Sequence, residues 1–356
     1  MTTLYRALCR FVAGAIVLAL AGCVTTPFQP PSEDLKAATV GSVLRSLSID
    51  RAVEDRILAL DPKRIGEDDI RNTLAKGPTP RIFEVHGGVY PVHLLMESFS
   101  EFLTGMGFPE DRIRDPGDGA FSRSPYDDSE RQAGEIAWYY EHEGVRPMLV
   151  GHSQGGIQIV KILHELAGTF GTARRAFNPL TAQFEERTTI VDPLNGRERP
   201  VVGVSAAYAS VVGTGGWALV LPVHWKVVHV IRSIPDTVDD FTGYRIGVDF
   251  FAWDAPGFEG VKTFHATGKA KVRNVTLPAE YSHVFVPATA QLALSPEMRA
   301  WINAFDPDDE KGRAPLPDGA VSNIMWAADV WHSIKEHWCL EAQRLIRTRR
   351  AALGTS

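Results

Sequence analysis

The chain has 356 residues, of which 44% are hydrophobic and 22% are charged. This composition is typical of globular proteins, so it excludes a disordered or collagen-like chain, and the length allows one large domain or two modest ones. The 37 Lys and Arg residues against 43 Asp and Glu residues give a formal net charge of -6, which argues against a general nucleic-acid binder.

Residues 1–22 have the features of a signal peptide. Arg6 and Arg10 precede an apolar run at residues 11–21, which is shorter than the roughly 20 residues that span a bilayer. The run ends in Leu-Ala-Gly-Cys at residues 20–23, which resembles the lipobox of bacterial lipoproteins.

The lipobox resemblance implies cleavage before Cys23 and a lipid on the Cys23 thiol. The lipid would attach the chain to a membrane of the bacterial cell envelope. Val24 stands where some bacteria use Asp to retain lipoproteins at the inner membrane, which favours the outer membrane. An uncleaved anchor or an ordinary secretory signal is the alternative interpretation.

The next two segments are expected to join the membrane to the main domain. Residues 23–40 contain three prolines after Cys23 and predict a tether. Residues 41–80 predict an N-terminal helical extension, because apolar residues recur at helical spacing over residues 42–60. Cys339 is then the one cysteine left for a free thiol, and no internal disulfide is expected.

Residues 81–305 alternate short apolar runs with helical patterns. This alternation predicts an α/β domain with a parallel sheet covered on both faces. Ser129 is the expected cap of the second helix, and Gly144 its stop. The predicted strands are residues 81–85, 112–114, 147–151, 201–204, 226–231 and 271–277, and the predicted helices are residues 92–106, 128–143 and 154–168.

Residues 169–225 are expected to form an insert that covers a site at the carboxyl edge of the sheet. They contain Asn195-Gly196 between apolar flanks, which indicates a hairpin, and an apolar, glycine-rich stretch at 206–225. Residues 306–356 predict a C-terminal helical extension. Its three tryptophans could contact a membrane, but packing on the domain is the favoured interpretation (Trp326, Trp331 and Trp338).

The most specific motif is Gly-His-Ser-Gln-Gly-Gly at residues 151–156. Gly-x-Ser-x-Gly suits a tight strand-to-helix turn that exposes the Ser153 hydroxyl at the sheet edge, where the helix N-terminus favours a developing oxyanion. A buried strand precedes the motif and an apolar helix follows it, so we prefer this interpretation to an ordinary turn serine. Ser205, in a near-match that lacks the final glycine, is interpreted as the end of a strand.

On these residues the chain resembles the serine α/β-hydrolases of the lipase and esterase kind, over about residues 80–305. The resemblance reaches only the superfamily level. It implies the α/β-hydrolase fold, a mostly parallel central sheet with helices on both faces, and an insert over the active site.

The resemblance also implies an oxyanion hole at His86-Gly87-Gly88, which follows the first predicted strand. Gly88 and Gln154 would supply the backbone N–H groups, with Val89 as the alternative to Gly88. We expect His86 to shape this loop rather than to catalyse. Glu84 is unexpected in a buried strand, so it must be paired or lie near the strand's end.

In this superfamily the acid follows the nucleophile in the chain, and the histidine follows the acid. His283 lies after the last predicted strand and is the expected base, whereas its rival His265 precedes that strand. Asp236 is the expected acid because it leaves the predicted strand at 226–231. The alternatives that remain open are Asp239 and Asp240 in the same predicted loop, and Asp254 after the apolar run at 248–253.

The sequence holds no HExxH, paired CxxC or phosphate-binding glycine-lysine motif, so no metal or other cofactor is expected. The predicted function is hydrolysis of a small-molecule or lipid carboxylic ester through an acyl-serine intermediate. A peptidase, thioesterase or acyltransferase with the same residues is the alternative within this chemistry. A catalytically inactive envelope lipoprotein of hydrolase fold is the alternative outside it.

Overall fold

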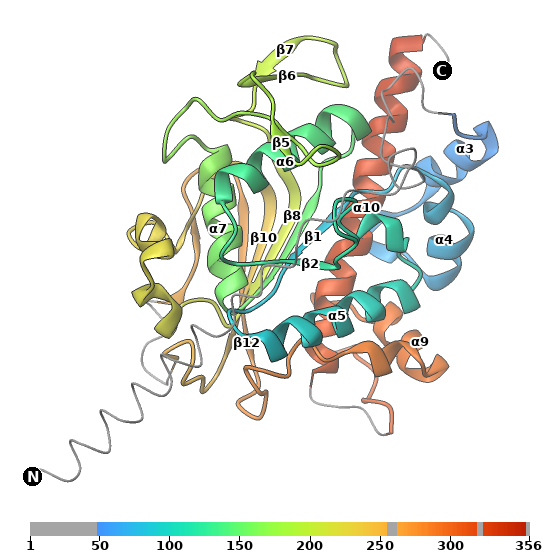
Figure 1. Cartoon of the computed structure of the whole chain (residues 1–356). Coiled ribbons are helices and arrows are strands. Elements are labelled where there is room, and N and C mark those ends of the chain that lie inside the picture. The colour runs from blue at the N-terminus through green and yellow to red at the C-terminus, as the bar shows by residue number, and fades with distance from the viewer. Residues whose placement is uncertain (1–47, 255–261, 319–322, 354–356) are drawn as a thin grey trace, which may run out of the picture.

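A six-stranded parallel sheet lies between two layers of helices in the computed structural model (Figure 1). The structure describes residues 48–254, 262–318 and 323–353. The strands run in the order β12-β10-β8-β3-β1-β2, and every neighbouring pair is parallel. Their bounds are β1 Ile82–Val85, β2 Ser122–Arg123, β3 Met148–His152, β8 Ala206–Val212, β10 Val238–Ile246 and β12 Lys271–Leu277. The expected α/β class with a parallel sheet is therefore confirmed.

The strand order reverses direction between β1 and β3. From β1 the chain moves outward to β2, and it then crosses back to β3 and continues in the other direction to β12. The loops that follow β1 and β3 therefore leave the sheet toward opposite sides. In open parallel sheets this switch point forms the crevice in which ligands bind, outside the carboxyl ends of the strands.

The helices divide between the two faces of the sheet (Figure 1). One face packs against α5 Tyr90–Gly105, α9 Pro296–Ala304 and α10 Ile324–Leu353, and the other against α6 Ser129–Glu143 and α7 Gln154–Leu166. Helix α6 ends at Gly144 as expected, but its N-cap is Asp128, whose carboxylate accepts the Glu130 N–H. Ser129, the expected cap, instead donates its hydroxyl to Glu165 at 2.7 Å.

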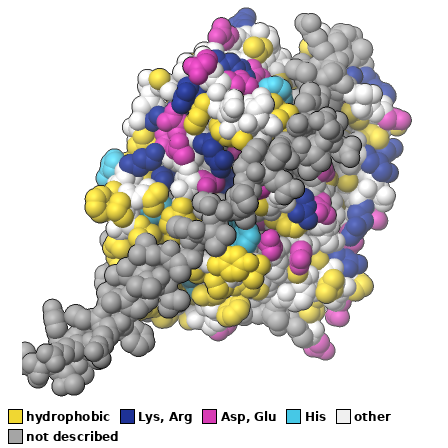
Figure 2. All heavy atoms as spheres, viewed as in Figure 1, with side chains coloured by type: hydrophobic (Ala, Val, Ile, Leu, Met, Phe, Trp, Pro, Cys, Tyr) yellow, Lys and Arg dark blue, Asp and Glu magenta, His cyan; other side chains and the backbone are white. Residues whose placement is uncertain are grey.

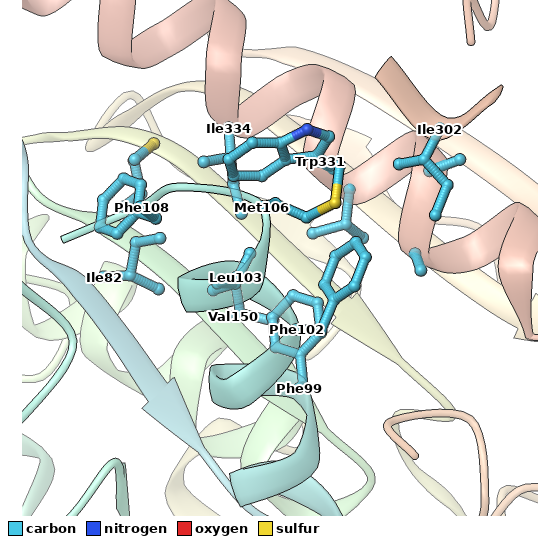
Figure 3. Packing of buried hydrophobic residues seen from close by; sticks show 14 of the residues in the cluster. Ile82, Phe99, Phe102, Leu103, Met106, Phe108, Val150, Ile302, Trp331 and Ile334 are labelled. Carbon is cyan, nitrogen blue, oxygen red and sulfur yellow. The ribbon is translucent and has the colours of Figure 1, made fainter. Parts of the chain in front are cut away.

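The tryptophans of α10 lie in the core and have no exposed surface: Trp326, Trp331 and Trp338 are all 0% exposed. Figure 3 shows Trp331 packed over the aromatic and aliphatic side chains of α5, with Phe102 among them. The favoured interpretation of this helix, packing on the domain, is confirmed. Over the described residues, no helix has the length and apolar character needed to cross a membrane.

The described part of the N-terminal extension is helical, as predicted, and it docks on α10. It comprises α3 Arg51–Ala59, η1 Pro62–Arg64, α4 Glu67–Asn72 and η2 Leu74–Lys76. The Asp50 carboxylate caps α3 by accepting the Ala52 N–H at 2.7 Å. Gln343 of α10 donates to the Ile57 carbonyl at 2.9 Å, and Arg350 pairs with the buried Glu54 at 2.8 Å.

Three predicted strands are wrong. Residues 112–114 form the end of a 3-10 turn, η3 Glu110–Arg112, and the turn and bend after it. Residues 201–204 form a turn in which Gly203 takes φ 93°, and residues 226–231 belong to η5 Pro222–Val227 and the turns after it. The sheet instead uses β8 and β10, so the predicted insert at 169–225 wrongly includes the central strand β8.

The segment between α7 and β8 carries two small hairpins, and shorter elements join the later strands. The hairpin expected at Asn195-Gly196 is present between β6 and β7, which pair antiparallel. The remaining bounds are β4 Phe177–Asn178, β5 Gln183–Phe184, β6 Thr189–Val191, β7 Glu198–Pro200, η4 Gly216–Val220, β9 Ser233–Ile234, β11 His265–Ala266 and η6 Ala290–Ala293.

Glu84 is a buried carboxyl within β1. Its side chain faces α5, where the Ser100 hydroxyl donates to Oε2 at 2.6 Å, and the residue is 0% exposed. Burial raises the pKa of Glu84 to about 8, although Ser100 and Arg123 oppose that rise. The expectation that Glu84 must be paired or terminal is met by the Ser100 hydrogen bond.

We expect replacement of Glu84 by glutamine to remove a pH dependence of stability. The unfolded carboxyl loses its proton near pH 4.5, whereas the folded one keeps it up to about pH 8. The free energy of unfolding should therefore fall between these values as pH rises, by at most ~1.4 kcal/mol per unit. Urea unfolding at pH 5 and pH 8 should show this loss in the wild type and in the exposed control Glu101→Gln, but not in Glu84→Gln. Equal pH dependence in all three would contradict the assignment.

Candidate active site

Ser153 occupies a sharp turn between β3 and α7, at the carboxyl edge of the sheet. It is the N-cap of α7 and has φ 55° and ψ -118°, one of few non-glycine residues described with positive φ. Gly155 permits this turn, because a Cβ there would overlap the Val85 carbonyl oxygen of β1. The Ser153 side chain is thereby held, partly exposed, at the switch point of the sheet.

His283 follows β12 and reaches back to Ser153. Its Nε2 lies 2.8 Å from Ser153 Oγ, and its Nδ1 lies 2.6 Å from Asp249 Oδ2. A carboxylate can only accept, so Nδ1 carries the proton and Nε2 is left free to accept the Ser153 hydroxyl proton. The structure thus brings together the two residues expected as nucleophile and base, and adds Asp249 behind them.

Asp249 is the residue that the sequence analysis missed. It follows the carboxyl end of β10 and is 3% exposed. Its Oδ1 accepts the Ala252 N–H at 3.0 Å, and its backbone pairs with Asp254 at 2.9 Å and 2.8 Å. The turn at 249–254 therefore fixes one carboxylate oxygen and aims the other at His283.

The expected acid, Asp236, is at the wrong edge of the sheet. It precedes β10, is exposed, and accepts the backbone N–H groups of Lys269 and Ala270. The nine residues of β10, at about 3.3 Å each, separate Asp236 from the edge that carries Ser153. The prediction of Asp236 as the acid is therefore wrong.

The three alternative acids are also wrong. Asp239 and Asp240 are the second and third residues of β10, at the same far edge. Asp239 pairs with Arg146 at 2.7 Å and Asp240 with His337 at 2.9 Å. Asp254 is at the correct edge, but its carboxylate binds Arg245 at 3.2 Å. The rival base His265 is in β11, which pairs with β9 outside the main sheet.

The loop after β1 lies against Ser153. A Cβ on Gly87 would come within 3.2 Å of Ser153 Cβ, and the Gln154 side chain lies against Gly88. Gln154 is the first residue of α7, so its N–H has no acceptor within the helix. The residues expected as oxyanion donors, Gly88 and Gln154, thus lie against each other next to Ser153, with Val89 next in the loop.

Two side chains fix the peptide groups of this loop. His86 Nδ1 donates to the Gly87 carbonyl at 2.7 Å, and the Tyr126 hydroxyl donates to the Gly88 carbonyl at 3.0 Å. Burial lowers the pKa of His86 to about 4, so its ring is neutral at pH 7. Because the C=O and N–H of a trans peptide point in opposite directions, these bonds also set where the Gly88 and Val89 N–H groups point.

His152 steadies the loop that carries His283. Its Nε2 lies 2.6 Å from the His283 carbonyl oxygen, and since a carbonyl only accepts, Nε2 carries the proton. Burial, with the adjacent His283 ring, lowers the pKa of His152 to about 3. His152 is therefore neutral, and its ring donates a hydrogen bond that holds the backbone of His283.

A cavity of about 380 Å³ opens beside the loop after β1. This volume lies within the range of small-molecule sites, about 300–1,000 Å³. Gly88, Val89 and Tyr126 are part of its lining, and the hairpin of β4 and β5 contributes Phe177 to the wall. The β4–β5 hairpin, which lies in the expected insert, thus forms part of the wall of this cavity.

An exposed cluster of aromatic side chains lies beside His283. Phe251 stands 5.2 Å from the His283 ring between centroids, and Trp217 contacts Phe250 and Trp253 at 6.0 Å and 5.1 Å. All four aromatic side chains are exposed. Figure 2 shows hydrophobic side chains gathered among charged ones in the lower part of the face in view. Exposed apolar patches of this kind commonly mark binding surfaces.

The arrangement can transfer a proton from Ser153 to His283 and stabilise negative charge beside the loop after β1. In the described part of the chain, no three His, Cys, Asp or Glu side chains gather as a metal site would require. No protein-family model and no curated protein matches this sequence. The chemistry of the site is therefore inferred from its geometry.

Proposed function

We propose that this chain is a serine hydrolase with the α/β-hydrolase fold, and that it cleaves carboxylic esters through an acyl-Ser153 intermediate. The observation that carries the proposal is the hydrogen-bonded series Ser153–His283–Asp249, with contacts of 2.8 Å and 2.6 Å. Ser153, the first residue of the series, lies in a strained turn at the switch point of the parallel sheet. Geometry and residue order, rather than sequence likeness, identify such a triad.

In the first half-reaction, Ser153 Oγ attacks the ester carbonyl carbon while its proton passes to His283 Nε2. The carbonyl oxygen becomes negative and is held by the N–H groups of Gly88 and Gln154, a contribution of several kcal/mol to the transition state. His283 then gives its proton to the leaving alkoxide, and the C–O bond breaks. Asp249 stays ionised and stabilises the imidazolium that forms in between.

In the second half-reaction, water replaces the alcohol. His283 takes a proton from the water, whose oxygen attacks the acyl carbon, and the same imidazole returns the proton to Ser153 Oγ. The products are a carboxylic acid and the free enzyme, and no atom changes its oxidation state. The buried Ala252 N–H bond keeps Asp249 oriented through both halves.

Two features support a small-molecule or lipid ester as substrate. The cavity of about 380 Å³ beside Gly88 accommodates one part of an ester. The aromatic cluster beside His283 presents apolar surface to another part, next to the imidazole that protonates the leaving group. Apolar surface favours ester and acyl chains over charged peptides.

The experiment for this proposal compares matched ester, thioester and amide substrates with one acyl group. The full-length chain in detergent is expected to show the highest kcat/KM for the ester, with loss of all activities in Ser153→Ala. A higher kcat/KM for the amide would identify a peptidase and overturn the ester assignment. No activity from folded protein on any substrate would favour the inactive envelope lipoprotein.

We also propose that the chain is a lipoprotein of the bacterial envelope. Its support is the Leu-Ala-Gly-Cys motif at residues 20–23, which lies outside the described residues. Several acyl chains on Cys23 would give a firm anchor. Cells fed labelled palmitate should incorporate it into the wild type but not into Cys23→Ala. Equal label in both would exclude Cys23 as the lipidated residue.

A further inference from the structure

A second, smaller cavity lies directly behind the Asp249 turn. Its volume is about 160 Å³, well below that of sites for drug-sized ligands. The carboxyl ends of β8 and β10 form its floor, and residues 252–254 and 262–264 form its walls. It lies on the α7 side of the sheet, because Phe264 of the wall packs with Phe241 of β10 in the core cluster on that side.

Arg232 lines this cavity. Its Nη2 donates to the Thr214 carbonyl at 2.8 Å, and its guanidinium lies over the Phe264 ring at 4.6 Å. Within the described ranges, no carboxylate oxygen comes within ion-pair distance of it. Burial lowers the pKa of Arg232 to about 10, and the charge of Asp254 opposes this shift only in part.

Lys262 lines the same cavity. Its Nζ donates to the Ala252 carbonyl at 2.7 Å, and it too forms no ion pair with a described carboxylate. Burial lowers the pKa of Lys262, and the neighbouring Arg232 lowers it further. Asp254, the carboxylate that lines the cavity, is engaged by Arg245 at 3.2 Å. Among the described residues, the lining therefore carries three cations and one carboxylate.

We infer that this cavity is a binding site for a small oxyanion, a carboxylate or a phosphate or sulfate group, held between Arg232 and Lys262. Both cations are partly buried, and a cation that is withdrawn from water without a counter-charge is destabilised. The planar Arg232 guanidinium offers parallel N–H donors that fit two oxygens of such a group. The small volume admits the anionic group and excludes a large ligand.

Hydrogen bonds connect this site to the proposed catalytic residues. The Lys262 Nζ binds the carbonyl of Ala252, and the N–H of Ala252 binds the Asp249 carboxylate. Ala252 thus links Lys262 to Asp249, and the charge of a bound anion alters the field that Asp249 and His283 experience. The oxyanion is either a free ion or an acidic group on the substrate, and both use the same two cations.

The binding test requires no turnover, so it is independent of the proposed function. The full-length chain in detergent is melted at increasing sulfate, with chloride at equal ionic strength as the reference. Sulfate raises the melting temperature of proteins in general, so the signature is a saturable rise at low concentration, as mass action requires for a site. The wild type is expected to show it.

Arg232→Gln and Lys262→Gln are each expected to weaken the apparent sulfate affinity by at least tenfold. Two variants are used because one could fold poorly, and glutamine at 262 keeps a donor for the Ala252 carbonyl. The control Lys271→Gln removes an 81% exposed cation on β12 and should respond as the wild type does. An equal saturable response in all four proteins, or none in the wild type, would overturn the proposal.

Kinetics then distinguish the two sources of the oxyanion. An ester with a terminal carboxylate is compared with its neutral analogue in the wild type and in Arg232→Gln. A KM that rises in the variant only for the carboxylate ester assigns the site to the substrate. Unchanged KM values, with sulfate binding lost in the variant, assign the site to a free ion.

Discussion

Replacement of Ser153 by alanine is expected to lower kcat/KM for an ester substrate by about 10³-fold or more. Without the hydroxyl no acyl-enzyme forms, and only the oxyanion donors and binding contacts remain. Initial rates of ester hydrolysis on the purified full-length chain measure the loss, and circular dichroism checks that the fold persists.

A matched control for this variant is Ser205→Ala. Ser205 stands in the near-match motif, but the structure places it just before β8, where its hydroxyl accepts from Arg146 at 3.4 Å. This variant should keep nearly full activity. Full activity in Ser153→Ala, with or without an effect of Ser205→Ala, would reject the acyl-serine mechanism.

Asp249→Asn is expected to lower kcat by about 10³- to 10⁴-fold, as loss of the triad carboxylate does in serine proteases. An amide carries no charge to stabilise the His283 imidazolium, and its NH₂ group can reverse the tautomer that leaves Nε2 free. Steady-state kinetics should show the loss in kcat, with KM changed little because Asp249 is buried behind His283.

Asp236→Asn is the comparison that separates the structure from the sequence-based prediction. Asp236 binds two backbone N–H groups at the far edge of the sheet, so its variant should retain activity close to that of the wild type. Large loss in Asp236→Asn with little loss in Asp249→Asn would show that the arrangement around His283 is not the one used in catalysis.

The residues around Ser153 were predictable because their constraints are local. The turn needs glycine where α7 crosses β1, and the strand before it and the helix after it have clear apolar patterns. The predicted strand at 81–85 and helix at 92–106 also match β1 and α5 to within a few residues. His283 could be placed because it follows β12, a strand with a distinct pattern.

The acid was missed because a wrong strand moved its expected loop. The run at 226–231 is apolar enough to suggest a strand, yet it lies in 3-10 and turn structure. The true strand β10 has Asp239 and Asp240 directly after its first residue and also contains Gly243 and Arg245, so its apolar signal is weak. Asp239, Asp240 and Arg245 are tolerated because each pairs with a side chain of opposite charge or hydrogen-bonding character in the tertiary structure.

The sequence-based prediction also missed strand β8, for a related reason. Its small residues, Ala206–Val212, continue into a glycine-rich stretch, which favoured an insert over a central strand. A strand buried on both faces shows no alternation of polar and apolar residues. Its position in the sheet depends on pairing with β3 and β10. This pairing cannot be inferred from the residues of β8 alone.

The most direct measurement of the central claim is covalent labelling of the full-length chain with a fluorophosphonate, followed by peptide mass spectrometry. This reagent reacts with a serine that is activated as a nucleophile. The account predicts one adduct per chain, on Ser153, which is lost in His283→Ala and strongly slowed in Asp249→Asn. A folded protein that forms no adduct, or one that carries it on another serine, would contradict the account.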